Sequence, residues 1–258
     1  MMSNSSLVRY TKLSPNCTKP RNHAIDTITI HCMAGNISVE TCGEVFAPTS
    51  RQASSNYGIG GDGRVALYVD EANRSWCTSS SSNDNRAVTI EVANSGGAPD
   101  WPVSDKAYAA LLDLVTDICK RNGIKKLLWK GDKGLIGQVD KQNMTVHRWF
   151  AAKACPGDYL YNRHAAIAEE VNKRLGAAAA PSTPTTPPAS TSTSYLVKVT
   201  ATELNIRKGP GTNYGTNGSI KDKGTYTIVA ESAGPGATKW GKLKSGAGWI
   251  SLDYAKKV

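Results

Sequence analysis

The sequence lacks several features that would place it in a common class. None of its apolar stretches reaches the roughly 20 residues that a membrane-spanning helix needs. The first dozen residues, MMSNSSLVRYTK, contain no apolar segment of a secretory signal peptide. Six cysteines at uneven spacings are too few to form a disulfide scaffold in 258 residues. We therefore expect no membrane insertion, and we expect synthesis in the cytoplasm with reduced thiols.

Acidic residues are fewer than basic residues. The sequence has 21 Asp and Glu and 31 Lys and Arg, which gives a net charge of +10. Such a balance favours anionic partners, for example nucleic acid or an anionic surface. The sequence has no helix-turn-helix, no basic stripe and no aromatic-rich platform for RNA. We therefore expect no nucleic-acid partner.

Charged and large apolar residues are absent from residues 177–194, AAAAPSTPTTPPASTSTS. Such a segment buries too little surface to offset its ordering entropy, and its prolines favour an extended chain. The composition predicts a flexible linker that separates residues 1–176 from residues 195–258. The first part has 21 basic and 17 acidic residues and the second has 10 and 4, so the second is more basic per residue.

The sequence of residues 1–176 predicts an α/β domain. Alternating β-branched residues are typical of strands, and Gly61-Asp62-Gly63 is typical of a hairpin turn. Ser104 is the expected start of a helix with apolar residues at helical spacing, and Gly123 is its expected end. The expected strands are residues 27–31, 57–60, 65–69, 87–93 and 144–147, and the expected helices are residues 104–123 and 163–175. This alternation predicts a mixed central sheet flanked by helices.

The second part predicts a small all-β barrel. Short strands alternate with turn sequences such as Gly209-Pro210-Gly211 and Asn217-Gly218 along its 64 residues.

Histidine is scarce, and two of the four histidines end predicted strands. These are His31 and His147, and Cys155 follows His147 by eight residues. Two imidazoles and a thiolate suit a tetrahedral Zn²⁺ and leave a fourth position for water. Taken by residue type alone, a strand-end His is usually structural and a single Cys is usually a small buried hydrophobe. Neither HExxH nor CxxC occurs, so the ordinary zinc-protease and zinc-finger patterns are excluded.

Four segments together resemble the N-acetylmuramoyl-L-alanine amidase family, which includes phage lysozyme-type amidases and animal peptidoglycan-recognition proteins. The segments are TITIHCMAG, SSNYGIGGDGRV, NRAVTIEVANSG and VHRWFAAKACPGDYL, within residues 20–175. The resemblance implies that His31, His147 and Cys155 bind zinc. Because binding-only recognition proteins often lose the third ligand, Cys155 favours an active enzyme.

The same resemblance implies catalytic roles for Tyr57, Glu91 and Lys153. Glu91 is expected to accept the proton of the attacking water, and Lys153 to stabilise the oxyanion. Tyr57 is expected to hydrogen-bond the same oxygen or the water. Each residue also has a structural interpretation, since a strand Tyr packs its ring, and Glu91 and Lys153 suit a solvated surface.

The segment RSWCTS has Cys77 where many relatives have a His. We expect Trp76 and Cys77 to form pocket wall or core rather than metal ligands. Trp76, Asn85 and Arg86, with Asn83 beside them, are the predicted substrate contacts.

Residues 195–258 resemble the bacterial SH3-like domain, chiefly in LNIRKGPGTNY and GWISLDYAKKV. Members of that family bind cell-wall peptides or glycans. The predicted wall-binding residues are Asn205, Arg207, Tyr214, Trp240 and Tyr254. The positive charge of this part suits anionic wall polymers.

Together these features predict an endolysin of a phage that infects Gram-positive bacteria. It is expected to cleave the amide between N-acetylmuramic acid and L-alanine after release from the host cytoplasm through a separate pore. Three alternatives remain open. They are a bacterial autolysin of the same chemistry, a non-catalytic peptidoglycan-binding protein, and a Cys-His peptidase that acts on the same wall.

Overall fold

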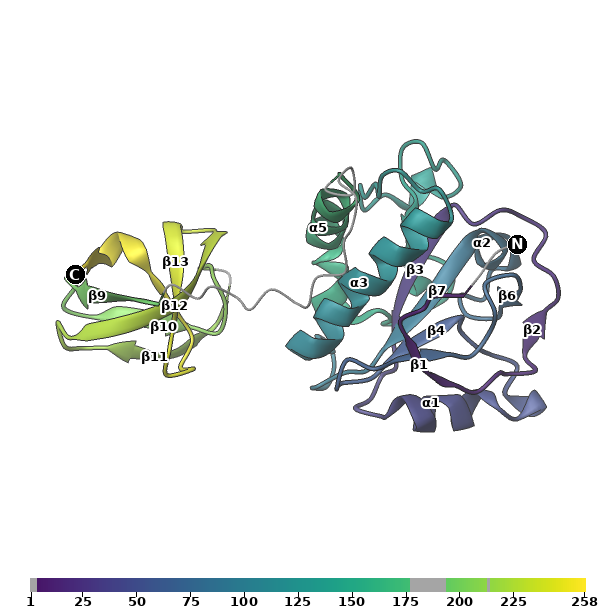
Figure 1. Cartoon of the computed structure of the whole chain (residues 1–258), viewed down its shortest axis with the longest axis horizontal. Coiled ribbons are helices and arrows are strands. Elements are labelled where there is room, and N and C mark those ends of the chain that lie inside the picture. Colours follow the sequence, from purple (N-terminus) through teal and green to yellow (C-terminus); the bar gives the residue numbers. More distant parts are fainter. Residues whose placement is uncertain (1–3, 177–193, 213) are drawn as a thin grey trace. The chain divides into compact units, whose positions relative to one another are not determined.

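The computed structural model describes residues 4–176, 194–212 and 214–258. The chain divides into two compact units, Met1–Pro181 and Ser182–Val258 (Figure 1). The predicted linker at residues 177–194 lies outside the described residues except for Ser194, so its boundaries and its flexibility stay predictions. Among the described residues, no helix combines the length and the apolar character needed to cross a membrane.

A six-stranded mixed sheet forms the centre of the first unit, in the order β1-β5-β4-β7-β3-β8. Only β4 and β5 are antiparallel neighbours, and the other pairs are parallel. The strands are β1 (Val8–Thr11), β3 (Thr27–Cys32), β4 (Tyr57–Ile59), β5 (Val65–Leu67), β7 (Ala87–Val92) and β8 (Met144–Thr145). A separate two-stranded ribbon pairs β2 (Cys17–Thr18) with β6 (Arg74–Ser75). The predicted mixed α/β class is confirmed.

Helices cover both faces of this sheet (Figure 1). Helices α3 (Asp105–Arg121) and α5 (His164–Gly176) pack together over one face, and α1 (Val39–Phe46) covers the other. Short helical segments connect the strands. They are α2 (Ser81–Arg86), α4 (Gly157–Tyr161), η1 (Thr49–Arg51), η2 (Lys133–Leu135) and η3 (His147–Trp149), where η denotes a 3-10 helix. The sequence predicted α3 and α5 but not α1, α2 or α4.

Helix α3 forms where its sequence predicts it. The Ser104 hydroxyl accepts a hydrogen bond from the Ala107 backbone N–H at 3.0 Å and so satisfies one unpaired donor of the first turn. Gly123 follows the helix at φ +70°, a conformation that glycine adopts without strain. The apolar positions at helical spacing are all buried: Ala107, Leu111, Leu114, Val115 and Ile118. They form the core between α3 and the sheet.

The central strands β3 and β7 are enclosed from both sides. All six residues of β3 are buried, as are five of the six in β7, which is typical of parallel strands covered on both faces. Ile30 and Ile90 join the core beneath α3. Because successive side chains alternate between faces, the neighbouring His31 and Glu91 point to the opposite face. This alternation decides which residues meet at the candidate site.

The second unit contains a seven-stranded antiparallel sheet in the order β11-β10-β14-β13-β12-β9-β15. The strands are β9 (Tyr195–Val199), β10 (Leu204–Arg207), β11 (Thr216–Ile220), β12 (Thr225–Gly234), β13 (Ala237–Leu243), β14 (Trp249–Ser251) and β15 (Ala255–Lys257), with the 3-10 helix η5 (Leu252–Tyr254). Its own apolar core includes Val197, Leu204, Ile228 and Ile250. The predicted all-β class is confirmed for the described residues.

Candidate metal centre and active site

Three adjacent strands align the first residues of the site. His31 in β3 pairs with Glu91 in β7, and Glu91 pairs in turn with Gly58 in β4. Paired residues share a face of the sheet, so His31 and Glu91 lie side by side. His31 Nδ1 is 3.9 Å from Glu91 Oε1. Strand register therefore places a carboxylate beside the first candidate ligand.

The other two candidate ligands come from the segment that follows β8. His147 is the first residue of η3 and does not end a strand as predicted, because β8 stops at Thr145. The ring centroids of His31 and His147 are 5.1 Å apart, and Cys155 Sγ lies 3.3 Å from His31 Nδ1. The potential ligand atoms of the three residues all lie within 4.8 Å of one another. The structure thus brings together the three residues that the sequence singled out.

Burial disfavours the charged form of both imidazoles. His31 is fully buried, so desolvation lowers its pKa well below the usual value, and the neighbouring His147 lowers it further. Burial also lowers the pKa of His147, and the positive charge of Lys153 adds to this effect. Neutral imidazoles are the form that binds a metal ion.

The arrangement fits a zinc ion by its donor types and by its unpaired atoms. His31 Nε2, His147 Nε2 and Glu91 Oε2 are buried and have no hydrogen-bond partner among the described residues. Buried polar atoms of folded proteins nearly always have a hydrogen-bond partner or bind an ion. Two imidazoles and one thiolate are donors that zinc prefers, and three protein ligands with a fourth position left open are typical of catalytic zinc sites.

Glu91 is the acid nearest to this triad. Its side chain is only 15% exposed, and Cys77 Sγ lies 4.0 Å from its Oε1 atom. Burial raises the pKa of Glu91 well above its usual value, Cys32 raises it further, and Arg51 counteracts both. A buried carboxyl group beside these candidate ligands is placed to exchange a proton with a neighbouring group.

A cavity of about 530 Å³ opens beside the triad, and His147 and Lys153 form part of its wall. Trp76 and Cys77 also line it, as the sequence analysis expected, and the Trp76 indole donates to Thr18 Oγ1 at 3.0 Å. The cavity wall contains two further cations that sequence reasoning missed, Arg51 and Arg74. The sequence around Arg51 carries no recognisable motif, whereas Arg74 stands in the quoted segment RSWCTS.

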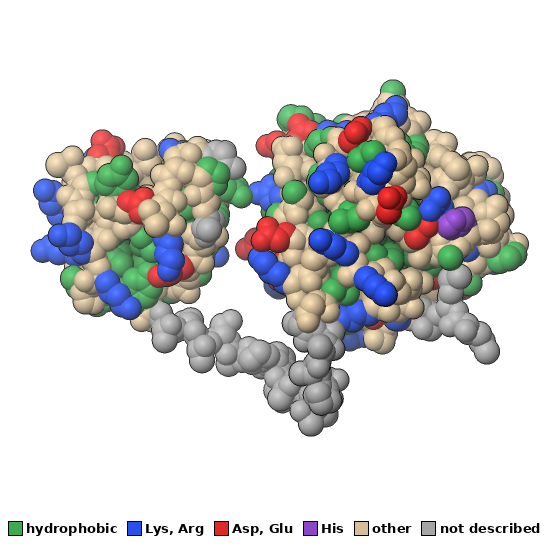
Figure 2. Space-filling view, turned by 90° about the horizontal axis from the view of Figure 1, so that it is seen from above, with side chains coloured by type: hydrophobic (Ala, Val, Ile, Leu, Met, Phe, Trp, Pro, Cys, Tyr) green, Lys and Arg blue, Asp and Glu red, His purple; other side chains and the backbone are tan. Residues whose placement is uncertain are grey.

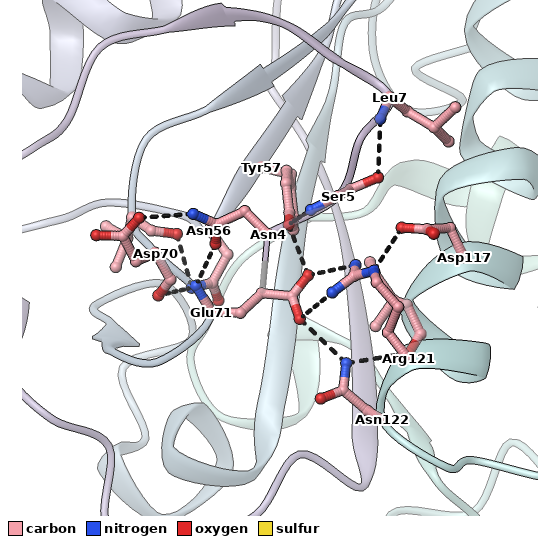
Figure 3. Close-up of polar contacts among 12 residues, drawn as sticks. Asn4, Ser5, Leu7, Asn56, Tyr57, Asp70, Glu71, Asp117, Arg121 and Asn122 are labelled. Carbon is pink, nitrogen blue, oxygen red and sulfur yellow. Dashed lines mark hydrogen bonds and ion pairs between the residues drawn. The ribbon is translucent and has the colours of Figure 1, made fainter. Parts of the chain in front are cut away.

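Tyr57 does not lie in this site, and the prediction of a catalytic role for it was wrong. Tyr57 pairs with Ile90, whereas Glu91 pairs with the next residue of β4. Tyr57 therefore shares the face of Ile90, and its ring points into the core on the α3 side. There its hydroxyl donates to Glu71 Oε1 at 2.6 Å and accepts from the Ser5 backbone N–H at 2.9 Å (Figure 3). Its phenol is held by a structural network on the far face of the sheet.

The network around Tyr57 contains a buried ion pair that the sequence did not reveal (Figure 3). Glu71 is fully buried, and Arg121 donates to both of its carboxylate oxygens, at 2.6 and 2.9 Å. Asn122 donates to Glu71 Oε2 at 3.0 Å, and the Glu71 N–H donates to Asn4 Oδ1 at 2.9 Å. These contacts tie the N-terminal segment and the end of α3 to the loop after β5.

The predicted substrate contacts Asn85 and Arg86 are also misplaced, and so is Asn83. Arg86 precedes β7 and pairs with Asp26, with Nε 3.0 Å from Oδ1. Glu91 lies five positions further along the extended chain, a span of about 17 Å. The Asn85 amide donates to the Ser81 carbonyl. The Asn83 amide group donates to Thr29 Oγ1 and accepts from Thr145 Oγ1. These side chains stabilise the start of β7 and do not reach the cavity.

The second unit has a cavity of about 380 Å³. Four of the five predicted wall-binding residues line it, namely Asn205, Arg207, Trp240 and Tyr254. Tyr214 is not among the lining residues. Its ring packs against Gly209, and its carbonyl accepts from Arg207 Nη1 at 2.8 Å. Figure 2 shows Lys and Arg side chains along the edge of this unit.

Comparison with known families identifies the class. The family described as N-acetylmuramoyl-L-alanine amidase matches residues 21–158, more than half of the chain, and the match includes all three candidate ligands. The chain belongs to this family. No curated protein matched the chain.

Several solved structures are similar to this chain. A selenomethionine derivative of AmpD has 16% identity over 65% of this chain and 97% of its own, with a TM-score of 0.49. The endolysin amidase LysCS from Clostridium intestinale URNW has 16% identity over 66% and 93%, with a TM-score of 0.42. The drosophila peptidoglycan recognition protein SD has 20% identity over 57% and 86%, with a TM-score of 0.40.

Proposed function

We propose that this protein is a zinc-dependent peptidoglycan hydrolase that cleaves the amide bond between N-acetylmuramic acid and the L-alanine of the stem peptide. The observation that carries the proposal is the convergence of His31, His147 and Cys155 beside Glu91. A cavity large enough for a peptide segment adjoins them. Membership of the amidase family supports the choice of bond.

Each residue of the site has a distinct task in this reaction. His31, His147 and Cys155 would hold the zinc ion, which would supply Lewis-acid activation of water and of the amide carbonyl. Glu91 accepts the proton that the attacking water loses and passes it to the nitrogen of the leaving L-alanine. Lys153, in the cavity wall with His147, supplies positive charge where the carbonyl oxygen becomes negative. The products are a lactyl carboxylate and a free amino group on L-alanine.

Digestion of purified cell wall tests this proposal. We expect new N-terminal L-alanine without new reducing sugar, loss of the signal after chelation, and recovery on addition of zinc. The Cys155→Ser variant should release no new ends while still sedimenting with the wall. Lysis that survives both chelation and Cys155→Ser would contradict the zinc mechanism, and binding without any cleavage by the wild type would favour a recognition protein.

We further propose that residues 195–258 form a bacterial SH3-like wall-binding domain. The all-β topology and the cavity lined by Arg207 and Tyr254 support this role. In the full chain carrying Cys155→Ser, Tyr254→Ala should weaken sedimentation with purified wall. The matched control Tyr226→Ala, which alters a Tyr that bonds Asp222 outside the cavity, should leave sedimentation unchanged. Equal sedimentation of both variants with purified wall would contradict a role of this cavity in wall binding.

The proposed biological setting is a phage endolysin that acts on a Gram-positive wall after release from the host cytoplasm. The combination of amidase and wall-binding parts supports this setting. Expression in the cytoplasm of a Gram-positive host should leave cells intact until the membrane is permeabilised, and should then lyse them. Lysis without permeabilisation would favour an exported autolysin.

A further inference from the structure

The cavity beside the metal centre has a positively charged wall that the proposed chemistry does not fully use. Arg51 and Arg74 line it together with Lys153. Over the described residues, none of these three side chains forms an ion pair with a carboxylate. Most other arginines of the first unit do form such pairs, for example Arg64, Arg86 and Arg121.

The acid in the cavity wall does not neutralise these cations. Asp84 is buried, and its carboxylate accepts from the backbone N–H groups of Cys77 and Thr78 at 2.9 and 3.1 Å. The Thr78 hydroxyl donates to it at 2.6 Å. Its lone pairs are directed into the loop that it organises, so the positive groups remain available for an anionic ligand.

The two arginines are held at the rim by local structure. Arg74 lies on β6, and its guanidinium donates to Thr18 Oγ1 at 2.5 Å. The Trp76 indole donates to the same hydroxyl, so Thr18 fixes both side chains. Arg51 ends the 3-10 helix η1 and lines the same cavity. A guanidinium has five N–H donors, so Arg74 keeps several of them free beyond Thr18.

We propose that Arg51 and Arg74 bind the free α-carboxylate of the D-glutamate that follows L-alanine in the stem peptide. This inference rests on the proposed amidase function. The scissile amide belongs beside His147 and Lys153, and two residues of extended peptide reach about 7 Å further. The same cavity contains both the catalytic end and the arginine pair. Planar guanidinium groups match carboxylates in shape and charge, whereas the amidated α-carboxyl group of isoglutamine carries no charge.

Two soluble substrates test this assignment directly. They are the γ-methylamides of N-acetylmuramoyl-L-alanyl-D-glutamate and of N-acetylmuramoyl-L-alanyl-D-isoglutamine, which differ only in whether the α-carboxyl group is a carboxylate or a carboxamide. We expect the full-length enzyme to prefer the acid by about tenfold in kcat/KM, the effect of one charge-assisted hydrogen bond. Arg51→Gln and Arg74→Gln should each reduce this preference, and the double variant should abolish it. Arg9→Gln, an exposed arginine outside the cavity, is the matched control and should keep the preference.

The outcomes separate this inference from the proposed function. Equal turnover of both substrates by the wild type, or a preference that survives in the double variant, overturns the carboxylate site. If neither substrate is cleaved, the amidase proposal fails, and calorimetric Kd values for the same two compounds decide the question. Tighter binding of the acid that is lost in the double variant then supports the site, and equal Kd values overturn it.

Discussion

Cys155 Sγ lies 3.3 Å from His31 Nδ1, although 124 residues separate the two in the chain. The Cys32 backbone N–H lies 3.4 Å from the same sulfur. The end of β3 therefore holds the thiol of a distant loop in place and so preorganises one edge of the metal triangle. Preorganised ligands reduce the ordering cost of metal binding. A ligand and a catalytic residue can then be told apart by measuring bound zinc and activity separately in each variant.

Substitutions at Cys155 and Glu91 should have different effects on bound zinc. Cys155→Ser removes a ligand, so we expect loss of both zinc and activity. Glu91→Gln keeps the shape of the side chain but cannot accept a proton, so zinc should remain near one equivalent while kcat falls by roughly 10²–10⁴. Elemental analysis of the dialysed protein and release of N-terminal L-alanine give the two readings.

The result for Glu91→Gln is the decisive one. Activity within a factor of about three of wild type would leave Glu91 as a wall residue of the site, since a general base contributes far more. Loss of zinc from Glu91→Gln together with loss of activity would instead make Glu91 a ligand or a support of one.

Tyr57→Phe should leave catalysis intact and weaken the fold. The change removes the hydroxyl that joins Glu71 to the Ser5 N–H on the α3 side of the sheet. Both partners are buried, so the free energy of unfolding should fall by about 1–3 kcal/mol. Urea unfolding measures the loss, and kcat on a soluble muropeptide should stay within about twofold of wild type. A hundredfold lower kcat at unchanged stability would return Tyr57 to the active site.

Tyr57 also shows where sequence reasoning reaches its limit. The segments around His31, Glu91 and Tyr57 were each predicted as strands, and β3, β4 and β7 formed there. The face on which each side chain lies depends on register, and Tyr57 is one residue away from the Glu91 row. A shift of one residue moves a side chain to the other face, and no local pattern records that shift.

The convergence of His31, His147 and Cys155 was expected chiefly from the resemblance to the amidase family, because the residue types alone left a structural interpretation open. The eight-residue spacing from His147 to Cys155 fits one short loop, and His31 stands at the end of a buried strand. Arg86 lacked such a signal. It is close to Glu91 in the sequence, but most of strand β7 lies between the two, so they are far apart in space. Arg51 and the Glu71–Arg121 pair depend on contacts between distant segments, which sequence spacing does not encode.

Arg121→Met should be strongly destabilising. It leaves the fully buried Glu71 carboxylate without its cation, a loss that costs about 3–5 kcal/mol. Arg174→Met is the matched control, because Arg174 pairs with the exposed Asp113 and Glu170 on the helix surface. The control should change the free energy of unfolding by no more than about 1 kcal/mol. Equal effects of the two substitutions in urea titrations would argue against a structural role for the Glu71–Arg121 pair.

His164 should make the first unit less stable in mild acid. Burial is the main cause that lowers its pKa to about 4, and its ring lies 4.4 Å from that of Trp129. Its unfolded pKa is about 6.5, so the unfolded chain binds the extra proton first as pH falls. Stability should decline between about pH 6.5 and pH 4, by about 3 kcal/mol in total, and stay level below.

The His164→Gln variant isolates this contribution. Its unfolding free energy should depend less on pH over that window than the wild-type value, whatever its absolute stability. His23→Gln removes a largely exposed histidine and should leave the wild-type slope unchanged. Identical slopes for wild type and His164→Gln would show that other groups cause the acid sensitivity.

Removal of the second unit should separate catalysis from targeting. Residues 4–176 have their own core and contain all three candidate zinc ligands, so a fragment of residues 1–176 should fold and hydrolyse soluble muropeptide within about twofold of the full chain. Lysis of whole cells should be much weaker, because a wall-bound anchor raises the local concentration of the enzyme at its substrate. Added salt should narrow this difference, since part of the attraction is between the positive second unit and anionic wall polymers. Equal loss of activity on both substrates would contradict the anchoring role and would make residues 195–258 part of the catalytic fold.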